Sequence, residues 1–200
     1  MTAPGQAASD PVQLLLASIT AHADMWANAY HGQRQSWRHS SFAALLLECG
    51  QLFLPAPRPA SITPGPPGSC FASAAELADR HDLVYVEGVV LTSGLPFAFD
   101  HAWCAGSSRR SDLVIDPTLP DGHALAYLGV PLTTAYRRTQ HADRGDDAIL
   151  TNGRLVISDN TVALRDGLPA ATTLQLGRLL PDPSAAVAAG GLIAAQDSTP

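Results

Sequence analysis

Three residues in this chain carry the side chains that thiol catalysis needs: Cys70, His101 and Asp116. Catalysis by a cysteine requires a thiolate near neutral pH, a base within reach of the sulfur, and a third group that orients the base. Cys70 follows Ser69 and opens a run of helix-forming residues that extends to about residue 80. We therefore expect Ser69 to cap a helix and Cys70 to lie in its first turn. Unpaired N–H groups there favour a charged sulfur and can supply half of an oxyanion hole.

His101 and Asp116 lie in two apolar runs, residues 99–105 and 113–116, which flank a Gly-Ser-Ser-Arg-Arg-Ser segment typical of a hairpin. If the tight loop is 107–110, residue 103 opposes 114 and His101 opposes Asp116. Directly opposed residues of antiparallel strands have Cβ atoms ~4.5 to 5.5 Å apart, so the carboxylate can accept the imidazole N–H. The pairing depends on this register, because a slip of one residue turns the two side chains to opposite faces.

Three short motifs resemble the core of transglutaminase-like proteins, a branch of the papain-like thiol enzymes. They are Gly-Ser-Cys-Phe-Ala at 68–72, His-Ala-Trp at 101–103 and Asp-Pro-Thr at 116–118. The resemblance covers about residues 68–132. It implies that Cys70 is the nucleophile at the start of a helix, with His101 and Asp116 on adjacent antiparallel strands as general base and orienting carboxylate. The implied reaction is acyl transfer through a thioester, which either hydrolyses an amide, peptide or isopeptide bond or transfers the acyl group to an amine.

The chain departs from the patterns of the families that it resembles in three ways. The oxyanion-hole side chain, a Gln or Trp in relatives, has no secure counterpart, because Gln51 precedes Cys70 by nineteen residues across a Pro-rich segment. The extra domains of animal transglutaminases are absent, so calcium activation is not carried over. Pro-Gly-Ser at 67–69 replaces the Arg-Gly-Gly of arylamine N-acetyltransferases, which disfavours an acyl-CoA donor. We predict a peptide, protein or amide-containing small molecule as substrate and no cofactor.

Two other interpretations remain open. The chain can be a catalytically inactive relative that binds a peptide or protein partner in the cleft. Cys70, His101, Asp116 and Cys104 can also be combined into a zinc site. Residues 101 and 104 point to opposite faces of a strand, however, so Cys104 is expected to pack in the core and no metal is predicted.

Four further residues are candidate substrate contacts: Ser69, Glu87, Trp103 and Tyr127. Ser69 adjoins the nucleophile, and Trp103 shares the face of His101, where it either lines the site or fills the core. Glu87 is the one acidic residue in an apolar run, so it either bonds backbone or Arg groups or contacts substrate. Tyr127 lies in a segment that either lines the cleft or reverses the chain. The six histidines other than His101 show no partner pattern and are given no role.

The elements that must position these residues indicate an α+β fold, with helices packed on an antiparallel sheet. Apolar spacing predicts helices from Pro11 to about residue 32 and from 41 to 53, with Cys49 in the core. Six prolines at 55–69 predict a loop. Buried strands are predicted at 83–91, 99–105 and 113–116, and a small meander at 148–150, 155–158 and 161–164.

Length and composition agree with one catalytic domain, residues 1–180, followed by a flexible tail at 181–200. The 200 residues are 46% hydrophobic and 15% charged, and the net charge is −6 with no Lys. This balance argues against nucleic acid or an anionic membrane surface as a partner.

No apolar run is long enough to span a bilayer, and the first residues lack the basic region of a secretory signal, so a cytoplasmic protein is expected. Three cysteines indicate no disulfide framework. The sequence says nothing about oligomeric state.

Overall fold

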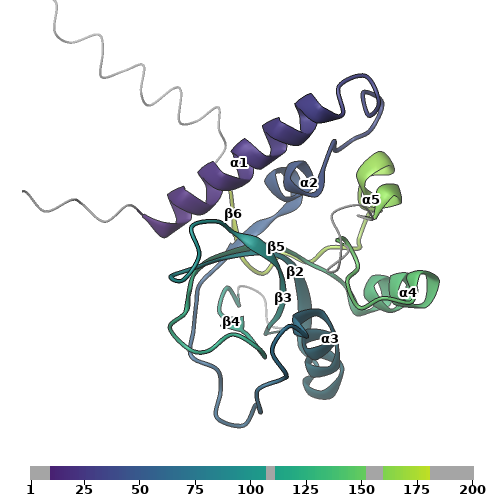
Figure 1. Ribbon diagram of the computed structural model, residues 1–200. Helices are drawn as coiled ribbons and strands as arrows, with labels where there is room; N and C mark the ends of the chain where they lie inside the picture. Colours follow the sequence, from purple (N-terminus) through teal and green to yellow (C-terminus); the bar gives the residue numbers. More distant parts are fainter. Residues whose placement is uncertain (1–9, 107–110, 152–159, 181–200) are drawn as a thin grey trace, which may run out of the picture.

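Helices and an antiparallel sheet build the chain, and Figure 1 shows their arrangement in a computed structural model that describes residues 10–106, 111–151 and 160–180. The described helices are α1 (Pro11–Ala29), α2 (Phe42–Cys49), α3 (Cys70–His81), α4 (Thr134–Arg144) and α5 (Thr161–Asp166). The described strands are β1 (Gln51–Phe53), β2 (Val84–Thr92), β3 (Phe99–Ala105), β4 (Val114–Ile115), β5 (Ala124–Pro131) and β6 (Arg178–Leu179). They pair antiparallel in the order β4-β3-β2-β5-β1-β6. The predicted α+β class is confirmed.

Local sequence signals set the helix starts. The Asp10 carboxylate accepts a hydrogen bond from the backbone N–H of Val12 at 3.0 Å, and Pro11 occupies the first helical position of α1. The Ser41 hydroxyl caps α2 in the same way. The prediction that this second helix continues to residue 53 is wrong, because Gly50 is extended and the chain enters β1 instead. β1 then pairs with β5 on one side and β6 on the other.

The predicted strands at 83–91, 99–105 and 113–116 are confirmed to within two residues as β2, β3 and β4. Tyr127 is not part of a chain reversal: it lies in β5, which pairs with β2 and β1 in the middle of the sheet, and it lines a hollow beside Asp116. The predicted meander is wrong where it is described: residues 161–164 begin α5, and 148–150 form no strand. Its segment at 155–158, the 107–110 loop and the tail at 181–200 lie outside the described residues.

The sheet has a different core on each face. The larger cluster packs α1, α2, α3 and α5 against one face, through residues such as Leu15, Leu46 and Leu128. Figure 1 shows α1 running across the sheet with α2 beside it. The smaller cluster, on the other face, is built from strands and loops around Trp103. None of the described helices is long and apolar enough to cross a membrane.

Close pairing of β2 and β5 depends on two facing glycines. Gly88 and Gly129 are register partners. A Cβ atom on Gly88 would lie 2.0 Å from the backbone oxygen of Leu128, and one on Gly129 would lie 2.5 Å from the Trp103 ring. Real side chains cannot approach so closely, so these glycines let the strands meet and let the indole ring pack over β5.

Candidate active site

His101 and Asp116 are hydrogen-bonded side chain to side chain, at 2.7 Å between Nε2 and Oδ2. The predicted register is nevertheless wrong, because β3 and β4 pair Cys104 with Ile115 and Ala105 with Val114. The residue numbers of each observed pair add up to 219, whereas those of the expected pairs, such as 103 and 114, add up to 217. A shift of two residues keeps every side chain on its face, so His101 and Asp116 still meet, on a diagonal.

The Asp116 carboxylate is buried and its acceptor positions are filled. Oδ1 accepts from the backbone N–H groups of Thr118 at 2.8 Å and Leu119 at 2.9 Å, which form an Asx turn. Oδ2 accepts from the Tyr127 hydroxyl at 2.9 Å as well as from His101. Burial favours the neutral acid, but these hydrogen bonds and the charge of His101 hold the pKa of Asp116 below its usual value. The carboxylate is therefore ionised at neutral pH.

The His101 ring is 2% exposed and is held as a charged imidazole. Burial lowers its pKa, but the hydrogen bonds and electrostatic interactions with Asp116 and Cys70 raise the pKa to about 9. Because Nε2 is bonded to Asp116, Nδ1 is the ring nitrogen left for the Cys70 sulfur. The structure thus brings together all three residues that the sequence singled out.

Cys70 is the first residue of α3 and is half-buried. Ser69 is the N-cap residue, as predicted, but its hydroxyl bonds the Pro66 carbonyl and the Ser73 hydroxyl rather than a helix N–H. The first N–H groups of α3 therefore have no intrahelical or Ser69 side-chain acceptor. Because Cys70 is the first residue of α3, these groups belong to the turn that carries its sulfur, and they are candidates for an oxyanion hole.

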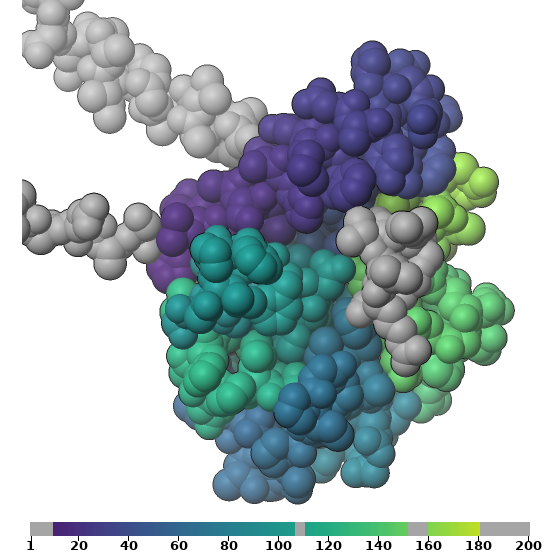
Figure 2. Space-filling model, in the orientation of Figure 1, coloured from purple at the N-terminus to yellow at the C-terminus, as the bar shows by residue number. Residues whose placement is uncertain are grey.

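The Pro-rich segment, residues 55–69, connects the two sides of the site. It forms neither helix nor strand, as predicted, and Figure 2 shows this blue segment at the bottom of the molecule next to α3. Arg58 donates to the backbone oxygens of Asp116 at 3.1 Å and Leu119 at 3.2 Å, and the N–H of Gly65 donates to Pro117 at 2.7 Å. Sequence analysis missed this role for Arg58. Its signal was a lone cation within a proline-rich run.

Trp103 and Tyr127 support His101 from within the smaller core. Both are at most 2% exposed, and Tyr127 also borders a surface hollow beside Asp116. The Trp103 ring stacks on the His101 ring at 6.3 Å and packs against Tyr127 at 4.9 Å and Phe53 at 5.7 Å. Of the two interpretations of Trp103, the core-filling one describes its position. Both aromatics restrict the orientation of the imidazole.

Glu87 lies on the opposite face of the sheet and is fully buried. Its carboxylate accepts from the backbone N–H groups of residues 149–151 at 2.7 to 2.8 Å and from the Tyr85 hydroxyl at 2.9 Å. Burial raises its pKa to about 7, although these hydrogen bonds favour the charged form. The backbone-bonding interpretation describes this residue: Glu87 fixes the segment after α4 to β2 and is not placed at the site.

The other predicted residues near the site have structural positions. Cys104 packs in the larger core, where its thiol donates to the Ala74 carbonyl at 3.2 Å, on the face opposite His101. The Gln51 amide is occupied by the backbone of residues 174, 176 and 177, so it does not supply an oxyanion hole. Cys49, predicted to be core, is half-buried at the end of α2.

Comparison with known proteins gives no relative. No protein-family model matches the chain, and neither does any curated protein or solved structure.

Proposed function

We propose that this protein is a thiol acyltransferase or hydrolase in which Cys70 is the nucleophile, His101 the general base and acid, and Asp116 the orienting carboxylate. The observation that carries the proposal is the buried His101 imidazole, bonded by Nε2 to Asp116 at 2.7 Å and interacting with Cys70. A packing cysteine needs no such partner, whereas a nucleophile needs a base that a third group orients.

The groups account for each proton in the reaction. The Cys70 sulfur, whose proton His101 already holds in the resting ion pair, attacks the carbonyl carbon of an amide. As the tetrahedral intermediate collapses, the C–N bond breaks and His101 returns the proton to the leaving amine, which leaves a thioester on Cys70. Water or a second amine then attacks the thioester with His101 as base. Asp116 stays ionised and stabilises the imidazolium throughout.

The order of elements supports a transglutaminase-like core. The nucleophile begins α3, the base lies on β3, and the carboxylate follows the neighbouring strand β4. This is the order that the three motifs imply, and it favours an amide, peptide or protein as acyl donor. The chemistry needs neither a metal nor an organic cofactor at these three residues.

Selective alkylation tests the proposal. In chelator-treated protein, we expect iodoacetamide at pH 7 to modify Cys70 at least about tenfold faster than Cys49, and Cys104 to stay unmodified because it is buried. Intact mass and peptide mapping identify the site. His101→Ala should slow the reaction of Cys70 and leave that of Cys49 unchanged, which makes Cys49 an internal control. Equal rates at Cys70 and Cys49 would refute an activated nucleophile.

Acylation separates an enzyme from an inactive relative that binds a partner. With p-nitrophenyl acetate, we expect a burst of nitrophenol and an acetyl adduct on Cys70, both absent in Cys70→Ala. Rapid alkylation of Cys70 without any acyl adduct would contradict the enzymatic proposal and favour the binding protein.

A further inference from the structure

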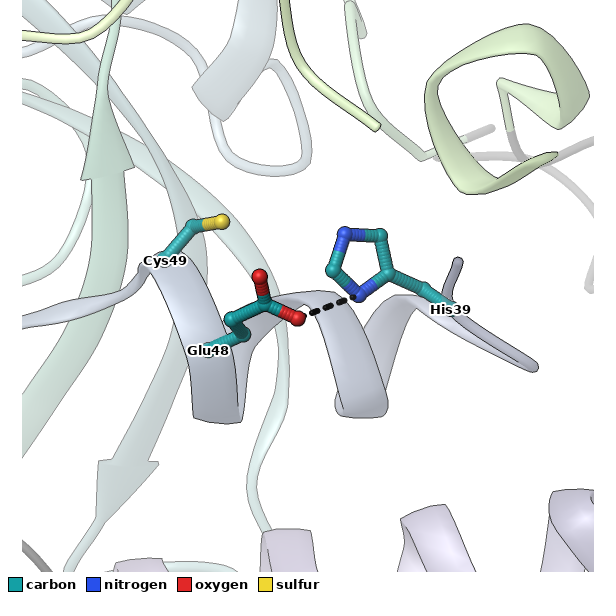
Figure 3. A group of neighbouring side chains, drawn as sticks. All are labelled: His39, Glu48 and Cys49. Carbon is teal, nitrogen blue, oxygen red and sulfur yellow. Dashed lines mark ion pairs between the residues drawn. The ribbon is translucent and has the colours of Figure 1, made fainter. Parts of the chain in front are cut away.

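A group of side chains outside the candidate active site can bind a metal. It lies at the end of α2. It consists of His39, Glu48 and Cys49, whose ligand atoms all lie within 4.8 Å of one another. Figure 3 shows the Glu48 carboxylate and the Cys49 sulfur on the same side of the His39 ring. Imidazole, carboxylate and thiolate are three ligand types that zinc accepts together.

The His39 ring has no good hydrogen bond although it is 2% exposed. Its Nδ1 faces Glu48 Oε2 at 3.5 Å, which is long for a hydrogen bond, and its Nε2 has no partner among the described residues. A buried polar atom without a partner costs stability, and such atoms in native proteins commonly mark a ligand or an ion. A metal ion bound through Nε2 would give that atom its partner.

The end of α2 favours a cation at this group, and the one cation that the described residues place beside it, Arg38, is paired with Glu48. Glu48 and Cys49 form the last turn of α2, where the helix dipole is negative, and no basic residue of α2 lies in that turn. Arg38 bonds Glu48 Oε1 from outside the helix, which leaves Oε2 directed at His39. An arginine that holds one carboxylate oxygen and orients the other is a typical outer partner of a metal ligand.

The backbone around the group is fixed and one side is open. The N–H groups of Arg38 and His39 donate to the carbonyls of Arg165 and Leu164 at 3.0 and 2.9 Å, which ties this segment to α5. Glu48 and Cys49 also line a surface hollow of about 340 Å³ with Asp166. Tetrahedral zinc needs its ligand atoms about 3.4 to 3.6 Å apart, closer than the 4.8 Å limit within which these atoms lie, so the exposed Glu48 and half-buried Cys49 side chains must rotate toward His39 to close the group.

We propose that His39, Glu48 and Cys49 bind a single zinc ion, with water from the hollow as fourth ligand. The ion joins the end of α2 to the segment that precedes it, and through that segment to α5. This site is separate from Cys70, His101 and Asp116, and it stands or fails independently of the acyl-transfer proposal.

Cobalt(II) titration of the chelator-treated full chain tests the site. We expect one cobalt per chain, an ultraviolet thiolate-to-cobalt charge-transfer band, and loss of that band when one equivalent of zinc is added. Cys49→Ser should abolish the band. Glu48→Gln, at an exposed position that leaves the core intact, should weaken cobalt affinity at least about tenfold.

Two controls make the outcome specific. Cys70→Ser should keep the band, which excludes cobalt at the candidate active site. His141→Gln should also keep the band, because His141 is a surface histidine beside a carboxylate and outside the proposed site. Absence of the band in the wild-type chain would overturn the proposal. So would a band that persists in Cys49→Ser.

Discussion

The Asp116→Asn substitution probes the charge that holds His101 in place. A folded-state pKa of about 9 for His101, against 6.5 in an unfolded chain, corresponds to about 3 kcal/mol of unfolding free energy. Because the folded-state pKa is the higher one, this stabilisation is complete below pH 6.5 and is lost as the pH rises through 9. The wild-type protein should therefore become less stable over that range.

Asparagine keeps the shape of the site and removes its charge. Its amide oxygen can still accept from the N–H groups of Thr118 and Leu119, and its NH₂ group can donate to a neutral His101. With the carboxylate gone, burial of the ring favours the neutral form, so the pH dependence from this pair disappears. Because Cys70 also raises the pKa of His101, we expect Asp116→Asn to lose most of the about 3 kcal/mol near pH 6.5 and much less near pH 10.

Urea unfolding followed by tryptophan fluorescence, at several pH values from about 6 to 10, measures both curves. Asp24→Asn, an exposed carboxylate on α1, is the control and should change the unfolding free energy by less than about 0.5 kcal/mol. An equal loss from Asp116→Asn at both ends of the range would refute the argument, because the pair would then act without its charge.

Three other substitutions test the framework by urea unfolding. Glu87→Gln should cost about 2 kcal/mol or more, because an NH₂ group replaces an oxygen that accepts buried hydrogen bonds, while the exposed Glu76→Gln should cost little. Gly88→Ala should cost several kcal/mol more than Gly94→Ala, which meets no atom within 4 Å; equal costs would refute the close strand approach. Tyr127→Phe should cost about 2 kcal/mol, since it removes a hydrogen bond to a buried carboxylate, and an unchanged stability would contradict this bond.

Local signals in the sequence located most of the candidate site. A serine before a helix-forming run placed Cys70 at the start of α3, and a run of apolar residues placed His101 in β3. Side chains alternate between the two faces of a strand whatever its register, so the sequence also predicted that His101 and Cys104 point to opposite faces. That is why the contact between His101 and Asp116 was found although the predicted register was wrong by two residues.

Long-range contacts decided the rest. Residues 51–53 continue a helical spacing of apolar residues, but they form β1 because β5 and β6 offer hydrogen-bonding partners there. Tyr127 and Trp103 are buried because the small residues of β5 and β2 let aromatic rings pack on that face. His39 meets Glu48 and Cys49 only after α2 folds back beside it. The sequence by itself determined which residues begin helices and which strand residues share a face, since both properties depend on neighbours along the chain. Only the tertiary structure decided strand register, burial and the grouping of distant side chains, because those depend on contacts that no local pattern encodes.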